Sequence, residues 1–120
     1  MKSLNFAVAA ALFLAAGSAA QANDLAAGQA AYQKFTCATC HGADGKTPTL
    51  PAYPVLAGQH ADYLAHALKA YKRGQAGAPA SSNIRKNPIM GAMASQLNDT
   101  DIANIAAWLS TLPSPLSVQK

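Results

Sequence analysis

The run Cys37-Ala-Thr-Cys-His41 constrains the fold of this 120-residue chain more than any other feature. Two thiols separated by two residues, with an imidazole directly after the second, form the CxxCH pattern of covalent haem attachment. Cys37 and Cys40 would each add to one haem vinyl group, and one helical turn would carry both sulfurs on the same side. His41 would then bind the iron as its proximal ligand. The pattern therefore predicts a fold built around one haem c.

Other uses of the two cysteines receive less support from the sequence. A disulfide between Cys37 and Cys40 would close a loop too small to stabilise the fold much. A dithiol oxidoreductase normally carries its cysteine pair in a βαβ pattern, which this chain lacks. A structural zinc site needs four ligands, whereas only His60 and His66 are left to complete one. Thiol–disulfide exchange by Cys37 and Cys40 stays as the alternative to haem attachment.

The first 22 residues have the pattern of a secretory signal peptide. Lys2 precedes an apolar stretch from Phe6 to Ala16, and small residues follow it. That stretch is well short of the roughly 20 apolar residues that a membrane span needs. We therefore predict that residues 1–22 are a cleaved signal peptide and that residues 23–120 form one domain without a membrane span. In a bacterium with an outer membrane, this domain would be periplasmic.

The composition is that of a small soluble domain once this leader is set aside. The whole chain is 51% hydrophobic and 12% charged, and the leader contributes part of the hydrophobic excess. The formal net charge of +4 becomes +3 when Lys2 is removed. An excess of this size does not indicate a nucleic-acid partner. The remaining chain can bury only a modest core, which a large prosthetic group would complete.

Three segments have the periodicity of amphipathic helices, and they are 24–34, 60–73 and 98–112. Asn23 or Asp24 is a suitable N-cap for the first helix and Asn98 for the third, whereas Gly74 and Pro113 would end the second and third helices. The intervening segments are rich in glycine, proline and small polar residues and predict neither helix nor strand. The expected fold class is therefore all-α, with three main helices around one haem.

Four ring side chains of these helices have expected positions. Tyr32 and Trp108 would pack between the first and last helices. His60 begins the second helix and His66 lies in its middle, and both are expected on the surface rather than on the iron.

The sixth position of the iron decides between electron transfer and ligand binding. The chain after the leader has two methionines, Met90 and Met93, and either thioether could fill that position and raise the reduction potential. Their spacing from His41 does not choose between them. An open sixth position would instead allow the protein to bind a gas or to react with peroxide.

Several motifs in a fixed order resemble those of the class I cytochromes c. They are Cys37-Ala-Thr-Cys-His-Gly-Ala-Asp-Gly45, Tyr53-Pro-Val-Leu-Ala-Gly-Gln59, Tyr63-Leu64, Met90-x-x-Met93 and Leu97-Asn-Asp-x-Asp-Ile102. They cover nearly all of residues 24–112 and are most similar to small periplasmic monohaem cytochromes and to one half of the dihaem cytochrome c4 group. The resemblance implies a class I cytochrome c fold and an electron carrier that is not an enzyme.

The resemblance also assigns residues around the iron. Met90 would be the axial ligand opposite His41, and Met93 would pack near the haem. The carbonyl of Pro54 would accept a hydrogen bond from the second ring nitrogen of His41 and so orient the imidazole. Because the loop after His41 is one residue longer than in similar proteins, Pro51 is the alternative acceptor.

Five basic residues lie between positions 69 and 86 with no acidic residue among them. They are Lys69, Lys72, Arg73, Arg85 and Lys86, and we call them the basic cluster. Such a group is either a solvated face or a docking patch for an acidic redox partner. The expected protein is a monomeric periplasmic carrier that meets donor and acceptor proteins transiently, or the cytochrome subunit of a larger oxidoreductase.

Overall fold

The computed structural model describes residues 23–115, and the predicted signal peptide lies outside the described residues. Within this range the chain forms helices and loops and has no strand. The helices are α1 (Leu25–Lys34), α2 (Ala38–His41), α3 (Ala61–Gln75), the 3-10 helix η1 (Ala80–Ser82), α4 (Pro88–Ser95) and α5 (Asp99–Thr111). The predicted all-α fold class is confirmed.

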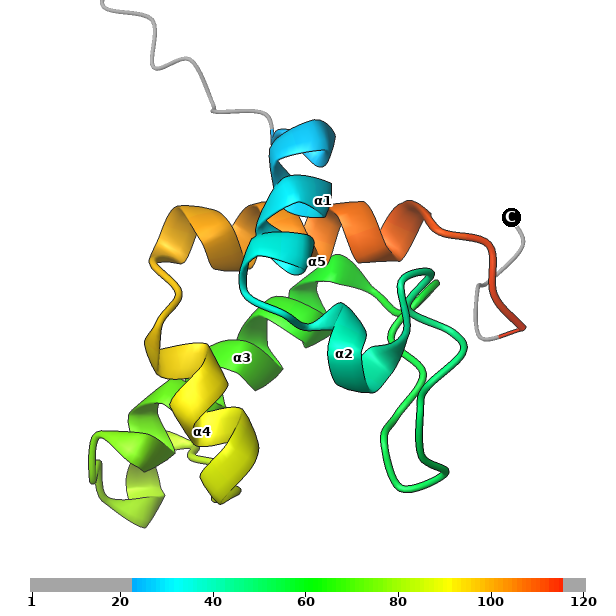
Figure 1. Cartoon of the computed structure of the whole chain (residues 1–120). Coiled ribbons are helices and arrows are strands. Elements are labelled where there is room, and N and C mark those ends of the chain that lie inside the picture. The colour runs from blue at the N-terminus through cyan, green and yellow to red at the C-terminus, as the bar shows by residue number, and fades with distance from the viewer. Residues whose placement is uncertain (1–22, 116–120) are drawn as a thin grey trace, which may run out of the picture.

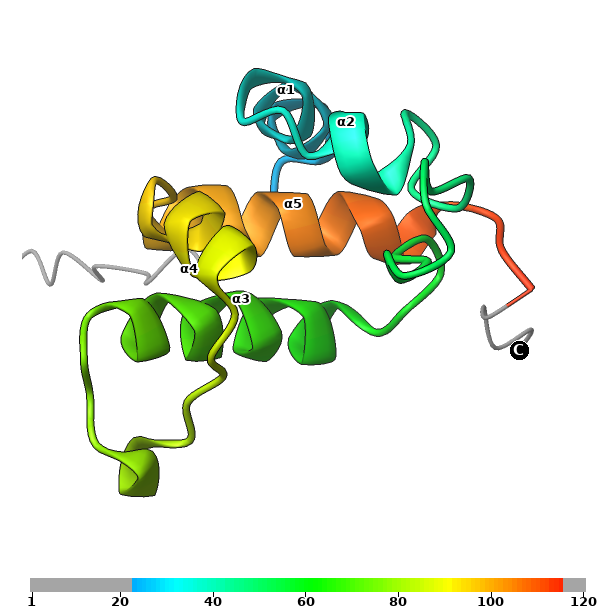
Figure 2. The ribbon, with the colours of Figure 1, turned by 60° about the horizontal axis from the view of Figure 1, so that its bottom comes forward.

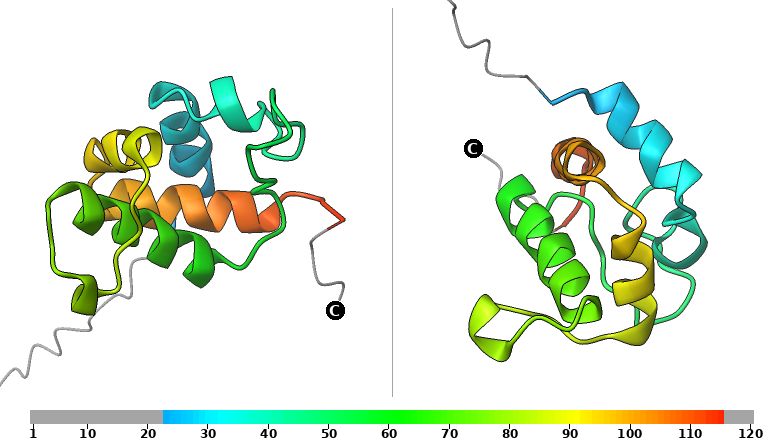
Figure 3. Two further views of the ribbon diagram at one scale, coloured as in Figure 1. Left: turned by 90° about the horizontal axis from the view of Figure 1, so that it is seen from below. Right: turned by 90° about the vertical axis from the view of Figure 1, so that its left-hand side faces the viewer.

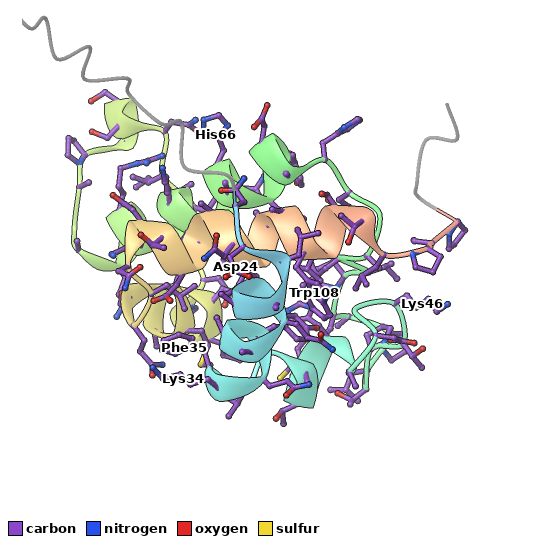
Figure 4. The ribbon with its side chains drawn as sticks, turned by 90° about the horizontal axis from the view of Figure 1, so that it is seen from above. Asp24, Lys34, Phe35, Lys46, His66 and Trp108 are labelled. Atoms are coloured by element: carbon purple, nitrogen blue, oxygen red, sulfur yellow. The ribbon has the colours of Figure 1, made fainter. Side chains whose placement is uncertain are left out.

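The crossing of α1 and α5 forms the centre of the core (Figure 1). The rings of Tyr32 and Trp108 pack there with their centroids 5.1 Å apart, as predicted, and Figure 4 shows Trp108 beside α1. A Cβ on Gly28 would lie 2.1 Å from the carbonyl oxygen of Asn104. The two helices therefore approach as closely as they do because position 28 has no side chain.

Side-chain caps fix the starts of both crossing helices. The Asp24 carboxylate accepts a hydrogen bond of 2.9 Å from the backbone N–H of Ala27 in the first turn of α1. Asn98 and Asp101 form a capping box at the start of α5, in which each side chain accepts a hydrogen bond from the backbone of the other residue. Asn98 was predicted as an N-cap, and the structure selects Asp24 from the two candidates Asn23 and Asp24. Asp and Asn suit this position because they offer an oxygen acceptor to the unpaired N–H groups of the first turn.

Helix α3 packs against α5 and runs past its predicted end (Figure 2). The sequence predicted that Gly74 would end this helix, but α3 continues to Gln75 and Gly74 is helical. A Cβ at Gly74 would lie 2.1 Å from the carbonyl oxygen of Arg85. This glycine therefore gives the returning chain room to lie against the helix, and it does not act as the stop.

Helix α4 corrects the prediction that residues 74–97 lack regular structure. The Asn87 side chain caps it by accepting hydrogen bonds from the N–H groups of Ile89 and Met90, and Pro88 occupies its first turn. Proline suits that position because its fixed φ matches the helix and its missing N–H would have no partner there. The loop 76–87, which contains η1, extends away from the end of α3 and then crosses back over α3 to reach this helix (Figure 2).

Both histidines outside the CxxCH motif are exposed, as predicted. His60 is the N-cap residue of α3, and His66 points outward from the middle of that helix (Figure 4). In residues 23–115 no helix combines the length and apolar character needed to cross a membrane.

Candidate haem-binding site

The turn between α1 and α2 sets the position of the first cysteine. The Thr36 N–H donates to the Gln33 carbonyl at 3.0 Å, and the Cys37 N–H donates to the Tyr32 carbonyl at 3.1 Å. These two bonds form a Schellman motif, which requires a left-handed residue at its turn. Thr36 adopts that conformation with φ of 57°, which is unusual for a β-branched residue. The turn leads the chain directly from α1 into the CxxCH motif.

Cys37 and Cys40 are free thiols that are partly exposed. Cys37 is the N-cap residue of the single-turn helix α2, and Cys40 lies within that helix. Burial raises the pKa of the Cys37 thiol, the nearby Cys40 raises it further, and a backbone hydrogen bond partly offsets both effects. A redox-active dithiol relies on the opposite change, a lowered pKa at its attacking cysteine. This environment therefore gives the thiol oxidoreductase alternative no support.

His41 is 6% exposed and held by one hydrogen bond. Its Nδ1 lies 3.0 Å from the carbonyl oxygen of Pro54. Because a carbonyl oxygen only accepts, Nδ1 carries a proton, and in the neutral imidazole Nε2 then has the lone pair. Among the described residues, Nε2 has no hydrogen-bond partner. Every buried side-chain nitrogen or oxygen of these residues does have a partner, so Nε2 is not a buried atom. Nε2 is therefore accessible, and it has the free lone pair that a metal ligand requires.

The structure places Pro54, and not Pro51, at the His41 ring. The loop that carries Pro54 is tied back to the core at several points. The Tyr32 hydroxyl, which is fully buried, donates to the Gly42 carbonyl at 2.8 Å, and the Gly58 N–H donates to the Leu109 carbonyl at 2.9 Å. Burial raises the pKa of Tyr32, so its hydroxyl keeps the proton that it donates. These bonds fix both ends of the loop.

An Asx-type turn shapes the first part of the same loop. The Asp44 carboxylate accepts hydrogen bonds of 2.9 Å from the N–H groups of Lys46 and Thr47, and one of 2.8 Å from the Thr47 hydroxyl. These donors hold the pKa of Asp44 below its usual range. Gly45, next in the chain, has φ of 66° and packs its backbone against the Leu109 side chain.

Several apolar side chains at the margin of the core are only partly buried. They pack against the buried cluster, and they include Phe35, Cys37, Ala38, Leu56, Ala61, Ala65, Leu68 and Leu112. A domain of this size usually covers such side chains, so their exposure fits a fold that a large apolar group completes. Two free thiols, an imidazole with an available nitrogen and this apolar surface together fit covalently bound haem.

Met90 and Met93 lie three residues apart on α4, and both are partly exposed. Helices α2 and α4 lie on the same side of the α3–α5 pair (Figure 3). The Met93 sulfur accepts a weak hydrogen bond of 3.8 Å from the Gln96 side chain. In the described part of the chain, the Met90 sulfur has no such donor. The sulfur of Met90 is thus the freer of the two.

The basic cluster does not form one uniform charged face. The side chains of Lys72, Arg73 and Arg85 donate hydrogen bonds to other parts of the fold. Within residues 23–115, the side chains of Lys69 and Lys86 make no hydrogen bond. Lys69 lines a shallow surface depression together with Lys72, Arg73, Ala76 and Asp99. The carboxylate of Asp99 reduces the positive charge of this depression. The sequence did not reveal these internal roles.

Comparison with known proteins identifies the family. Residues 25–113 match the family model for Cytochrome c. The chain belongs to the cytochrome c family. It is 44% identical over 94 residues to cytochrome c-554(548) of Halomonas halodenitrificans, an alignment that covers 75% of this chain and 98% of that protein. Its cofactor is accordingly haem c, and the family's role is electron transfer.

Other relatives are about twice as long as the matched region. The chain is 34% identical over 122 residues to the "Thiosulfate dehydrogenase electron acceptor" of Stutzerimonas stutzeri, covering 96% of this chain and 51% of that protein. The crystal structure of reduced cytochrome c4 from Pseudomonas stutzeri superposes with a TM-score of 0.66 at 39% identity, covering 77% of this chain and 47% of that one. The expected class I cytochrome c fold is confirmed by this match, and the chain corresponds to about half of such relatives.

Proposed function

We propose that this cytochrome c is a one-electron carrier with His41 and Met90 as the two axial ligands of its haem iron. Haem c, when bound, supplies an iron atom that exchanges one electron with a partner. Cys37 and Cys40 would hold the group covalently, and the Pro54 carbonyl would orient His41. The observation that supports this most strongly is the His41–Pro54 hydrogen bond, which leaves Nε2 of a buried imidazole available. Met90 is favoured over Met93 because Gln96 donates to the Met93 sulfur.

Absorption spectra of the matured protein, oxidised and reduced, with and without carbon monoxide, test this proposal. A low-spin spectrum that carbon monoxide leaves unchanged would support a carrier with both axial positions filled. Rapid binding of carbon monoxide would favour a gas- or peroxide-reactive protein, and the absence of a haem spectrum would favour thiol exchange.

Paired methionine variants test the choice of ligand. Met90→Ala should open the sixth position, so that carbon monoxide binds and the reduction potential falls, because thioether ligation favours ferrous iron. Met93→Ala, on the same helix, should leave the low-spin spectrum unchanged. The reverse pattern would assign Met93 as the ligand.

We further propose that redox partners dock transiently and that Lys69 and Lys86 contribute to the encounter. These are the members of the basic cluster whose side chains make no hydrogen bond within residues 23–115, so they are free to meet an acidic surface. Rates of electron transfer with an acidic partner should then fall as salt rises, and Lys69→Gln together with Lys86→Gln should weaken that dependence. A rate that does not respond to salt would exclude electrostatic docking.

A candidate donor follows from a relative's name. Because the Stutzerimonas stutzeri relative is named as the electron acceptor of a thiosulfate dehydrogenase, we propose an enzyme of that class as one donor to this chain. Stopped-flow reduction by purified thiosulfate dehydrogenase and thiosulfate tests this. No reduction above the rate with thiosulfate alone would exclude it.

The N-terminal pattern supports export to the periplasm. Mass spectrometry of the protein from a periplasmic fraction should give a mature chain that begins at Asn23 and carries one haem. A chain that keeps residues 1–22, or that is recovered from the cytoplasm, would contradict this proposal.

A further inference from the structure

Three members of the basic cluster connect α3 with the chain on either side of α4. The loop 76–87 leaves α3, passes through η1 and returns to begin α4 (Figure 2). Arg73, in the last turn of α3, donates from Nε to the Ser82 carbonyl at 2.9 Å and from Nη2 to the Asn83 carbonyl at 2.8 Å. One guanidinium thus holds two consecutive carbonyls at the end of η1. Bonds from a charged donor are among the stronger hydrogen bonds in proteins.

Arg85 fastens the next part of the loop to the same helix. Its backbone N–H donates to the Ala70 carbonyl at 3.1 Å, and its backbone passes close over Gly74. Its guanidinium lies over the rings of Tyr63 and Tyr71, at 5.4 and 5.6 Å from their centroids. It also donates to the Tyr63 hydroxyl at 3.1 Å. The side chain and the backbone of Arg85 therefore bind α3 together.

The far end and the middle of α4 are fixed to α3 as well. The Lys72 ammonium donates to the carbonyl of Leu97, just after α4 ends. In the middle of α4, Gly91 is buried against the Gln75 side chain, and a Cβ there would lie 2.5 Å from the Gln75 oxygen. Residues of α3 thus contact the loop before α4, the residue Leu97 after α4, and Gly91 in the middle of α4.

We propose that Lys72, Arg73 and Arg85 are positioning residues that fasten α4 to α3 and so fix the place of the Met90 sulfur. This inference rests on the proposed role of Met90 as axial ligand. It gives these cations a different role from partner docking. Because they bind carbonyl groups and tyrosines on their own chain, their charges are already engaged when a partner arrives. Their removal should alter the stability of methionine ligation before it alters the encounter with a partner.

The experiment compares the matured haem proteins carrying Arg73→Gln, Arg73→Lys and Lys86→Gln. Arg73→Gln removes the charge and the paired hydrogen bonds. Arg73→Lys keeps the charge but loses the planar guanidinium that reaches two carbonyls. Lys86→Gln is the control, because it removes the charge of a side chain that makes no hydrogen bond within residues 23–115. The first readout is amide hydrogen exchange of α4, which reports fastening of the helix whatever binds the iron. The second is the near-infrared band of methionine-ligated ferric haem and the pH at which that band is lost.

Both Arg73 variants should exchange the α4 amides about tenfold faster than wild type, because a charge-assisted bond is lost. They should also lose the methionine band at a lower pH, by about one unit for a tenfold change. Lys86→Gln should match wild type in both readouts. Equal behaviour of Arg73→Gln and Lys86→Gln, or faster exchange with an unmoved band, would overturn the proposal. Met90→Ala separates this proposal from the proposed ligand role of Met90. If the methionine band survives in that variant, Met90 is not the ligand. The exchange data alone would then still decide whether Lys72, Arg73 and Arg85 fasten α4.

Discussion

At the scale of single residues, Thr36 carries backbone strain directly before the haem-attachment motif. Its φ of 57° is a left-handed conformation that costs an L-residue about 1–2 kcal/mol. Thr36→Gly should raise the free energy of unfolding by about 1 kcal/mol, because glycine removes the strain but adds freedom to the unfolded chain. Chemical denaturation of the haem protein measures this. Thr36→Ala keeps the Cβ and should show no gain; equal gains from both variants would mean that the Thr side chain, and not the φ angle, is unfavourable.

Asp44 should make the free energy of unfolding depend on pH in the acid range. Its three hydrogen bonds lower its pKa in the folded protein, whereas the carboxyl of an unfolded chain has a pKa of about 3.9. The stabilisation is therefore complete above that value and is lost as the pH falls through the lower folded pKa. Between about pH 5 and pH 3, wild type should lose more stability than Asp44→Asn. Denaturation curves at each pH test this, and parallel losses would show that Asp44 is not linked to folding.

At the scale of elements, the crossing of α1 and α5 depends on Gly28. A methyl group there would meet the Asn104 carbonyl oxygen at 2.1 Å and the Trp108 Cβ at 2.9 Å. These backbone and Cβ atoms can move only if a whole helix shifts. Gly28→Ala should therefore destabilise the protein by about 2–3 kcal/mol, even though alanine favours the helical conformation over glycine by about 1 kcal/mol. Thermal or chemical unfolding measures the change. Gln29→Ala, exposed on the same helix, should change stability by less than about 0.5 kcal/mol, and a similarly mild Gly28→Ala would show that the crossing can adjust.

Elements with local signals were predictable from the sequence, whereas elements that distant contacts hold were not. Helices α1 and α5 could be predicted from the capping residues Asp24 and Asn98 and from an apolar stripe in each helix. Helix α4 has eight residues, most of them apolar, so it lacks the contrast between a polar and an apolar face. The loop that leads to it is bound to α3 by hydrogen bonds from Arg73 to backbone carbonyls, and any sequence offers such acceptors.

The candidate site divides in the same way. The CxxCH motif and the Pro54 carbonyl at His41 could be named from the sequence, because motif spacing and resemblance carry them. The internal roles of Lys72 and Arg85 could not, because a basic residue looks the same in the sequence whether its side chain meets solvent or another part of the fold. Only the path of the chain distinguishes the two cases.

At the scale of the whole molecule, the protein core is only partly closed by the described chain. Buried residues such as Tyr32, Ile102 and Leu109 form its closed part, while Leu56, Leu68 and other apolar side chains that pack against it are only partly buried. Their full burial would contribute about 25 cal/mol for each Å² removed from water. A chain of this size has a small free energy of unfolding, so we expect burial of these side chains by the haem to be needed for a stable core.

Loss of covalent attachment should therefore convert the protein to a loosely packed state. We expect the double variant Cys37→Ser with Cys40→Ser, isolated without haem, to keep part of its helical far-ultraviolet signal, lose the near-ultraviolet signal of Trp108 and bind a hydrophobic dye. The matured wild type should unfold cooperatively and bind no dye. A haem-free variant with native near-ultraviolet signals and a cooperative transition would show that the α1–α5 crossing sustains the fold alone. In that event the exposure of Leu56 and Leu68 would reflect only the shape of the binding surface, and the stability of the domain would not depend on the group it binds.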